Sequence, residues 1–304
     1  MKIYKIGTRN SPLAMWQAQF FAQKLQHLGL QTQICPIMAS GDKNLNQPLY
    51  ALGITGVFTK DLDIALLNGE IDFAVHSLKD VPTRLPQNVE LSCYLARDFE
   101  QDVLVRSPQA QQKDLNQLSI ATSSLRRRAF WLQQYPDAQF ADIRGNVQTR
   151  LQKLNDGVAD ATLFSLAGFK RLQAEVAYEH LPFMIPAPAQ GVIAVCSRIS
   201  EAEGYAFLSQ INHLPTQKCV EIERDFLQDL EGGCTAPIGA LAKMDDNNQV
   251  HFVARLNSLD GKKSLSLNEN CLWEENLGRK FSAQIKAQGG EALMAEIKQN
   301  VKLL

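Results

Sequence analysis

The feature that most constrains the fold is a regular alternation of strand-like and helix-like segments at the start of the chain. Ile3–Thr8 is predicted to be a strand, and Ser11 followed by Pro12 is typical of a helix start. The apolar residues of this helix recur at helical spacing and are expected on one buried face before Gly29 ends it: Leu13, Trp16, Phe20, Phe21, Leu25 and Leu28. The segment predicts a β-α unit.

The alternation continues to about residue 95. A second strand is predicted at about Thr32–Ile37, a polar loop with glycines at Ser40–Gly56, a helix from about Thr59 and an apolar strand at Ile71–Val75. Alternating strands and helices favour an α/β lobe whose sheet is largely parallel and buried.

A second α/β lobe is predicted because the pattern starts again at about Phe99. Strands are expected near residues 103–105, 120–122, 140–143 and 161–164, with helices that begin near Ser124, Asn146 and Gly168. Pro186–Gly191 is predicted to be a hinge, because its two prolines fix φ and lack an N–H donor. The apolar strand at 192–196 would then cross back to the first lobe.

A smaller α+β unit is predicted at the C-terminal end. It has a helix after Pro215, strands at about 237–242 and 250–256, and a helical region over about 272–298 with a break at Gly289. The expected domains are lobe 1 at residues 1–95 and 193–213, lobe 2 at 96–192, and a C-terminal domain at 214–304.

Composition limits the classes of partner. The chain has 304 residues, with 31 Lys and Arg against 32 Asp and Glu, so no global charge attracts it to nucleic acid or to a membrane surface. No apolar run approaches the length of a signal peptide or a membrane span. The six cysteines form no C-x-x-C pair, which disfavours a zinc ribbon or a thioredoxin-type site. We therefore expect a cytoplasmic, monomeric protein.

Arginines recur where predicted strands end. They follow the first strand and lie at the two strand-to-helix turns of lobe 2: Arg9, Arg126, Arg127, Arg144 and Arg150. In open α/β sheets, ligands bind beyond the carboxyl ends of the strands. A guanidinium group can bind a carboxylate through two hydrogen bonds, so the set predicts a ligand that carries many carboxylates.

A lysine and an aspartate, Lys79 and Asp80, directly follow the apolar strand at 71–75. We expect Asp80 to stabilise a developing cation or to exchange a proton with a leaving amine, and Lys79 to hold a substrate carboxylate. Farther along, Cys234 follows Gly232 and Gly233, which free the backbone and remove bulk around the sulfur. This favours an exposed thiol to which a large group can be attached.

Each of these features also has a purely structural interpretation. Arg126–Arg128 could form a solvated helix face, Lys79 and Asp80 a surface ion pair of little energetic value, and Cys234 the buried first residue of a strand. The functional interpretation depends on their joint occurrence.

Five segments, in order over nearly the whole chain, resemble motifs of the porphobilinogen deaminase (hydroxymethylbilane synthase) family: Ile6–Ala14, Ala74–Pro82, Thr122–Arg127, Arg144–Val147 and Glu231–Cys234. The resemblance implies an α/β fold of two lobes like those of periplasmic binding proteins, with mixed, largely parallel sheets, plus a small C-terminal α+β domain. It also implies a transferase of porphyrin and heme biosynthesis. Such an enzyme joins four porphobilinogen molecules head to tail, releases ammonia, and forms the linear tetrapyrrole hydroxymethylbilane.

The resemblance further implies roles for individual residues. Cys234 would carry a dipyrromethane cofactor through a thioether, and Asp80 would be the catalytic residue beside the reacting pyrrole nitrogens. No metal is implied. The residues expected to bind the carboxylates of cofactor and substrate are Arg9, Ser11, Ser77, Lys79, Thr122, Ser124, Arg126, Arg127, Arg144, Gly145, Arg150, Arg171 and Gln190.

The chain departs from the family pattern at three places. Ala51 and Thr55 stand where the family usually has lysines, Pro188–Gly191 differs from the usual Val-Gly-Gln-Gly, and Val195–Arg198 lacks the usual acidic residue. The lost charges would weaken binding of cofactor or intermediates, so a slow, diverged enzyme is one alternative. A non-catalytic two-lobed protein that binds polycarboxylates is another. A nucleic-acid-binding module is disfavoured because the basic residues are dispersed and lack interleaved aromatics.

Overall fold

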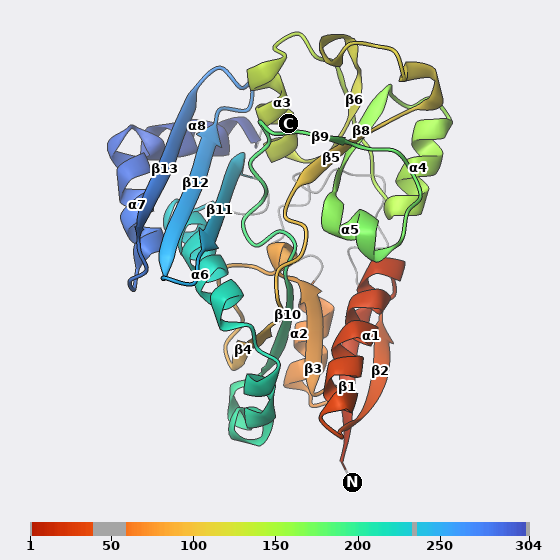
Figure 1. Ribbon diagram of the computed structural model, residues 1–304, viewed down its shortest axis with the longest axis vertical. Coiled ribbons are helices and arrows are strands. Elements are labelled where there is room, and N and C mark those ends of the chain that lie inside the picture. Colours follow the sequence, from red (N-terminus) through yellow and green to blue (C-terminus); the bar gives the residue numbers. More distant parts are fainter. Residues whose placement is uncertain (1, 39–58, 233–235, 302–304) are drawn as a thin grey trace.

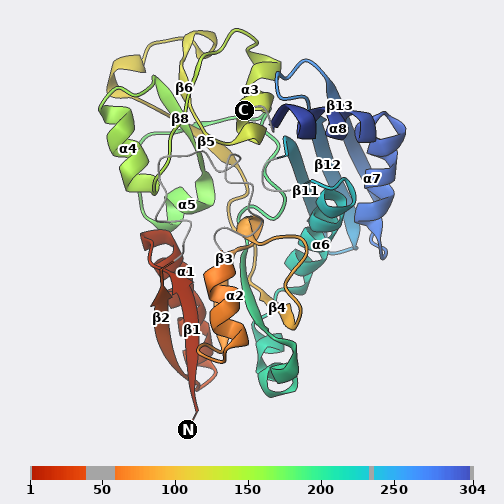
Figure 2. The same cartoon turned by 180° about the vertical axis from the view of Figure 1, so that it is seen from behind.

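The computed structural model describes residues 2–38, 59–232 and 236–301, which form two α/β lobes and a third, smaller domain (Figure 1). Lobe 1, which contains the N-terminal strand, lies at the bottom of Figure 1, and lobe 2 lies at the top. The C-terminal domain stands beside them, and the view from behind in Figure 2 shows the same arrangement.

Lobe 1 is built on a five-stranded sheet with the order β2-β1-β3-β10-β4. Strand β1 pairs in parallel with β2 and β3, whereas β10 runs antiparallel to β3 and β4. The elements are β1 (Ile3–Arg9), α1 (Pro12–His27), β2 (Gln31–Ile37), α2 (Lys60–Leu67), β3 (Phe73–Ser77), the 3-10 turn η3 (Leu78–Asp80), β4 (Val89–Tyr94) and β10 (Ile193–Arg198).

Helix α1 begins as the sequence predicts, because the Ser11 hydroxyl accepts a hydrogen bond from the Ala14 N–H at 3.3 Å. Its buried face differs from the predicted one. Trp16 and Phe20 are only partly buried and stack on each other, with ring centroids 5.3 Å apart. Three of its buried residues are alanines, and these small side chains allow the helix to pack close to the sheet. The buried residues are Ala14, Gln17, Ala18, Phe21, Ala22 and Leu25.

Lobe 2 repeats this topology in the order β7-β6-β8-β5-β9. Strand β6 is parallel to β7 and β8, and β5 is antiparallel to β8 and β9. The elements are β5 (Asp102–Arg106), β6 (Ile120–Ala121), α3 (Leu125–Gln134), β7 (Phe140–Ala141), α4 (Val147–Asn155), β8 (Ala161–Ser165), α5 (Leu166–Arg171) and β9 (Glu179–His180). In each lobe, therefore, the fourth strand of the sheet is antiparallel to its neighbours.

Two crossovers connect the lobes and run side by side. The first crossover is residues 95–101, between β4 and β5, and the second is residues 181–192, between β9 and β10. The Leu95 N–H donates to the Ile193 carbonyl at 3.0 Å, and the Asp98 N–H donates to the Gly191 carbonyl at 3.3 Å. The second crossover leads into β10, so the predicted return of the chain to lobe 1 is confirmed.

The C-terminal domain packs an antiparallel sheet, in the order β11-β12-β13, against helices. Its elements are α6 (Leu214–Asp229), β11 (Ile238–Met244), β12 (Gln249–Asn257), β13 (Ser264–Leu272), α7 (Leu277–Ala287) and α8 (Gly290–Val301). The break at Gly289 falls between α7 and α8, as predicted. Strand β13 was not predicted, because polar residues such as Asn268 and Asn270 on its exposed face obscure the strand pattern.

Glu223 of α6 joins this domain to both crossovers. Its fully buried carboxylate accepts two hydrogen bonds from the Arg97 guanidinium at 2.8 Å each, one from the Ala189 N–H at 2.6 Å and one from the Ala242 N–H at 2.7 Å. These four bonds fill the hydrogen-bonding capacity of a buried carboxylate, so all three parts of the molecule meet at one satisfied charge.

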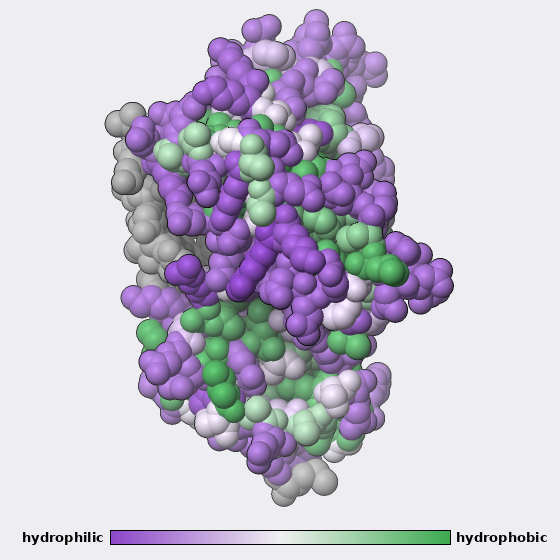
Figure 3. Space-filling model, turned by 90° about the vertical axis from the view of Figure 1, so that its left-hand side faces the viewer, coloured by the Kyte–Doolittle hydropathy of each residue, from purple (hydrophilic) through white to green (hydrophobic). Residues whose placement is uncertain are grey.

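The face in Figure 3 is mostly hydrophilic in its upper half, and hydrophobic residues gather in its lower half, at the height of lobe 1. Within the described ranges, no helix combines the length and apolar character needed to span a bilayer.

Candidate active site

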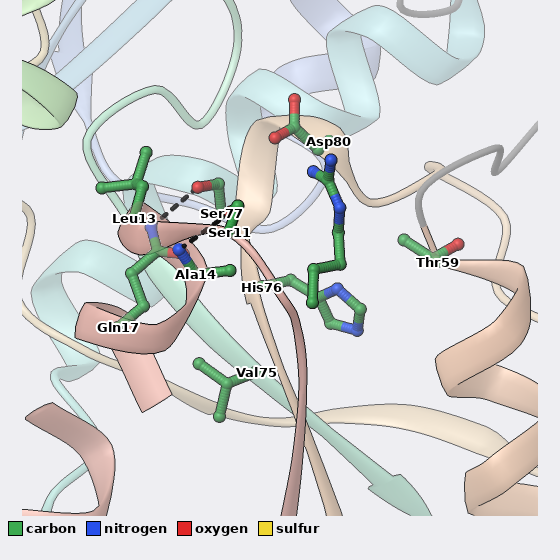
Figure 4. A pocket seen from close by; sticks show the side chains of 10 residues that line it. Ser11, Leu13, Ala14, Gln17, Thr59, Val75, His76, Ser77 and Asp80 are labelled. Carbon is green, nitrogen blue, oxygen red and sulfur yellow. Dashed lines mark hydrogen bonds between the residues drawn. The ribbon is translucent and has the colours of Figure 1, made fainter. Parts of the chain in front are cut away.

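A pocket lies at the carboxyl ends of β1 and β3, which are adjacent parallel strands of lobe 1 (Figure 4). This is where ligands bind in open α/β sheets. Seven polar residues line it, drawn from β1, the start of α1, the start of α2, β3 and η3: Arg9, Ser11, Gln17, Thr59, His76, Ser77 and Asp80. Four of these, Arg9, Ser11, Ser77 and Asp80, are predicted site residues.

The inner wall of the pocket is polar but mostly uncharged. The Gln17 amide donates to the Ser77 hydroxyl at 2.7 Å, which ties α1 to the end of β3. Burial, with the nearby Arg9 charge, lowers the pKa of His76 to about 4, so its imidazole is neutral at pH 7. Gln17 and His76 were not predicted as site residues, since neither residue type signals its burial from sequence alone.

Asp80 and Lys79 lie on the turn η3, which other parts of the molecule hold in place. The Leu78 N–H donates to the Val192 carbonyl at 2.9 Å, and Arg224 of α6 donates to the carbonyls of Val81 and Pro82 at 2.9 and 2.7 Å. These bonds fix the turn so that Asp80 lines the pocket.

The Lys79 ammonium reaches toward the second crossover. Its Nζ donates to Oε1 of Gln190 at 3.1 Å. Burial lowers the pKa of Lys79 to about 8; the nearby Arg127 and Arg126 charges lower it too, while Asp80 and Asp102 counteract part of the effect. Lys79 of lobe 1 therefore lies within electrostatic reach of the lobe 2 arginines.

The lobe 2 arginines gather at the start of α3. The Ser124 hydroxyl accepts a hydrogen bond from the Arg127 N–H at 3.4 Å and caps the helix, which begins near Ser124 as predicted. Arg126 and Arg127 are buried and each forms an ion pair with Asp102 at 2.7 Å. Both arginines thus point toward the crossovers instead of forming a solvated face, which excludes the structural alternative for this pair.

Arg150 of α4 joins the same group. Its Nη2 donates to the Thr162 hydroxyl at 2.9 Å and to the Leu163 carbonyl at 2.7 Å, and Arg127 Nη1 shares that carbonyl at 2.9 Å. Burial and the Arg127 charge lower the pKa of Arg150 to about 9. The structure therefore brings together Lys79, Arg126, Arg127 and Arg150, which we call the charge cluster.

The charge cluster carries more positive than negative charge. Its four cations have two neighbouring carboxylates among the described residues: Asp102, which pairs with Arg126 and Arg127, and Asp80, whose charge acts on Lys79. Buried cations without counter-ions are unfavourable, as the lowered pKa values of Lys79 and Arg150 show. A ligand with several carboxylates would supply the missing charge, so these residues fit a dipyrromethane with acetate and propionate groups.

The other predicted binding residues lie around the cluster. Thr122 is buried and its hydroxyl accepts from the Ser124 N–H at 3.2 Å, while Arg144 and Gly145 lie between β7 and α4. Gly145 has φ of 118°, and a Cβ there would lie 2.8 Å from Thr149 Cγ2, so glycine is required.

Arg171 lies at the crossovers. Its guanidinium makes two hydrogen bonds of 2.9 Å to Asp98 and one of 2.8 Å to the Gly191 carbonyl. In this structure it therefore links α5 to both crossovers. Cys234, Ala51 and Thr55 lie outside the described residues, so the predictions about them are untested.

Asp102 is the main residue of this site that was not predicted from the sequence. It precedes the apolar residues of β5 and is almost fully buried. An acidic residue at the edge of an apolar strand is a weak signal, because such residues usually lie in solvent.

Comparisons with known proteins agree with the motifs. Residues 4–205 match the family model described as "Porphobilinogen deaminase, dipyromethane cofactor binding domain", and residues 217–287 match "Porphobilinogen deaminase, C-terminal domain".

Similar proteins cover most of the chain. A porphobilinogen deaminase of Chlorobium phaeobacteroides is 38% identical, over 96% of this chain and 97% of that protein. A probable porphobilinogen deaminase of Methanocaldococcus jannaschii is 41% identical, over 93% and 99%. The chloroplastic porphobilinogen deaminase of Pisum sativum is 42% identical, over 86% and 74%. Among solved structures, an ancestral cationic amino acid solute binding protein matches with a TM-score of 0.44 and 16% identity, over 68% of this chain and 87% of that chain.

Proposed function

The chain belongs to the porphobilinogen deaminase family, and from this membership we propose that it is the transferase that joins four porphobilinogen molecules head to tail into hydroxymethylbilane. In each step a C–N bond of the substrate aminomethyl group breaks, ammonia leaves, and a C–C bond forms to the preceding pyrrole, which loses a proton. The observation that carries the proposal is the excess of buried positive charge beside the Asp80 turn.

The charge cluster would hold the acidic side chains of the growing product. Lys79 and the guanidinium groups of Arg126, Arg127 and Arg150 offer charge-assisted hydrogen bonds, each of which contributes about 1.5–3 kcal/mol to binding of a carboxylate. Arg9 and Ser11 would do the same in the pocket. The remaining predicted residues, Ser77, Thr122, Ser124, Arg144, Gly145, Arg171 and Gln190, are proposed to bind carboxylates directly or to support these groups.

Asp80 is proposed to stabilise the positive charge that develops on the substrate as ammonia leaves. The neutral His76 and the uncharged Gln17 and Ser77 leave its carboxylate as the negative group among the lining residues of the pocket. A partly buried carboxylate interacts more strongly with a developing cation than one in bulk water does. Asp80 could also take a proton from the reacting pyrrole.

The family model names a dipyrromethane cofactor domain over residues 4–205. When bound, the dipyrromethane supplies the pyrrole carbon to which the first substrate is joined. We propose Cys234 as its point of attachment, through a thioether, because the segment Glu231–Cys234 resembles the family motif.

We also propose the domain division stated above, a monomeric state and a cytoplasmic location. The two crossovers and the separate sheets support the division. The five described cysteines are free thiols, as expected of a reducing compartment.

Asp80→Asn tests the catalytic proposal. Loss of the carboxylate should lower the rate of bilane formation by about 10²- to 10⁴-fold, the range typical of a general acid–base group, while the protein stays folded. Asp137→Asn is a matched control, because Asp137 is exposed on lobe 2 and should leave the rate unchanged. A normal rate in Asp80→Asn would refute this role.

The intact mass of the purified protein tests the cofactor. Protein from a heme-producing host should carry an adduct that Cys234→Ser lacks. A wild-type protein without adduct that makes no bilane from porphobilinogen would instead favour a polycarboxylate-binding protein without catalysis.

A further inference from the structure

Asp102 occupies a central place between the two lobes. It is the first residue of β5, directly after the first crossover, and its side chain is fully buried. Its Oδ1 accepts hydrogen bonds from Arg127 Nε at 3.0 Å and Nη2 at 2.7 Å, and its Oδ2 lies 2.7 Å from Arg126 Nη1. One carboxylate therefore holds two consecutive arginines of the charge cluster.

The ion pairs hold the Asp102 carboxylate in its charged form. Burial alone would raise the pKa of Asp102, but the Arg126 and Arg127 guanidinium groups outweigh burial and hold that pKa well below its usual range. The benefit is mutual, because two adjacent buried guanidinium groups repel each other unless a fixed negative charge lies between them.

Asp102 is also connected to lobe 1 through the second crossover. Gln190 Nε2 donates to the Glu100 carbonyl at 2.6 Å and lies 3.3 Å from Asp102 Oδ1, while Gln190 Oε1 accepts from Lys79 Nζ at 3.1 Å. A continuous path of hydrogen bonds thus runs from Lys79, beside Asp80, to Arg127 at the start of α3. The position of the lobe 2 arginines relative to the Lys79–Asp80 turn depends on this path.

We propose that Asp102 is a positioning residue: it holds Arg126 and Arg127 in the orientation that receives ligand carboxylates, and does not touch the ligand itself. This inference rests on the proposed function, since it assigns the two arginines to carboxylate binding. A purely structural ion pair would contribute to folding alone. The two roles differ in whether removal of the charge changes the affinity for a carboxylate ligand in protein that is still folded.

The first experiment compares Asp102→Asn with Asp160→Asn. Asp160 lies in the same lobe and accepts hydrogen bonds from the Ser119 N–H at 2.9 Å and Lys113 Nζ at 2.7 Å, outside the charge cluster. Asp160→Asn should lower the thermal midpoint and leave the KM for porphobilinogen unchanged. Asp102→Asn should raise that KM by about tenfold or more, since charge-assisted bonds are misplaced, with a smaller rise in Asp102→Glu. An Asp102→Asn variant that loses stability but keeps the wild-type KM would overturn the proposal.

The second experiment does not require turnover. In wild type, the Arg127 Nε–H donates to Asp102, so its proton should exchange slowly with water in an arginine ¹⁵Nε–H NMR spectrum. That protection should be lost in Asp102→Asn and kept in Asp160→Asn. Benzenehexacarboxylate serves as a binding probe, and its Kd should rise by about tenfold or more in Asp102→Asn.

These readouts distinguish a failure of the proposed function from a failure of the positioning role of Asp102. If wild type forms no bilane yet binds the probe and loses affinity on Asp102→Asn, the proposed function fails and the positioning role stands. If probe affinity is the same in wild type and Asp102→Asn, the positioning role is wrong. Should Asp102→Asn not fold, Asp102→Glu keeps the charge but displaces it, and a wild-type KM together with wild-type Arg127 exchange in that variant would overturn the proposal.

Discussion

Lobe 1 and lobe 2 share one sheet topology but bury different groups where their strands end. In lobe 1, the buried polar residues in or beside the pocket are uncharged: Thr8, Gln17, Thr59 and His76. In lobe 2, the corresponding region buries Asp102 together with arginines. The same order of strands therefore supports two different chemical environments.

This difference in buried charge indicates which chemistry each lobe can support in the proposed site. Lobe 1 supplies a pocket in which Asp80 is the negatively charged group among the lining residues and Arg9 the positively charged one, which fits the proposed stabilisation of a developing cation by Asp80. Lobe 2 supplies cations for an acidic oligomer. In the proposed function, lobe 1 would carry the stabilisation of the developing cation and lobe 2 most of the carboxylate binding, and the fold by itself specifies neither of them.

Removing a lobe 2 cation should lower the stability of the protein substantially. Arg127→Leu takes away two of the hydrogen bonds to the buried Asp102, so we expect the free energy of unfolding to fall by about 3 kcal/mol, the lower end for a broken buried pair because Arg126 remains. Arg128→Leu is the matched control, since Arg128 is the next residue of α3 and is exposed. Denaturant unfolding measures both, and equal stability in the two variants would show that the ion pair of Arg127 with Asp102 does not stabilise lobe 2.

Packing provides a second comparison between the lobes. Trp131 in lobe 2 is completely buried, so Trp131→Ala should cost about 3–5 kcal/mol. Trp16 in lobe 1 is predicted from its helical spacing to be equally buried, yet it is only partly buried against Phe20. Trp16→Ala should therefore cost roughly half as much, about 1–2 kcal/mol. A cost for Trp16→Ala as large as that for Trp131→Ala would contradict the observed burial.

The sequence predicted the architecture better than the pairing of charges. The alternating segments, the Ser11 cap and the start of a helix near Ser124 depend on local patterns, and the structure confirms them. The crossover after Pro186 leads back to lobe 1 as predicted, while its role as a hinge stays a prediction. Asp102 escaped prediction because its partners lie 24 and 25 residues away in the chain (126 − 102 and 127 − 102), and only the folded lobe brings them together.

The sequence pattern also failed to predict which face of α1 is buried. The spacing of Trp16 and Phe20 gives the helix correctly, but the structure places alanines against the sheet because the close approach of α1 favours small side chains there. The sequence pattern also could not predict the ion pair of Arg171, because its partner Asp98 lies 73 residues earlier in the chain, in the first crossover.

The contact between the lobes should appear in the pH dependence of substrate capture. Lys79 must be charged to bind a carboxylate, and its lowered pKa of about 8 means that the charged fraction falls as pH rises through that value. We expect kcat/KM for porphobilinogen, which reports the free enzyme, to decline about tenfold per pH unit above pH 8. Lys79→Arg keeps the charge and should flatten the profile between pH 8 and about 9.5. A decline that is unchanged in Lys79→Arg would assign it to another group.

The smallest expected effect tests the crossover that holds the two lobes together. Ala189 has φ of 63°, a left-handed conformation that costs a residue with a Cβ roughly 1 kcal/mol, and its N–H is held by the buried Glu223 carboxylate at 2.6 Å. Ala189→Gly relieves the strain but increases the entropy of the unfolded chain, so the net gain in stability should be at most about 1 kcal/mol. Ala187→Gly, two residues earlier and outside the positive-φ region, should instead lose about 0.5–1 kcal/mol. Opposite signs in the two variants would show that the strain lies at Ala189, and a loss in both would mean that the added entropy of the unfolded chain outweighs the strain relieved at Ala189.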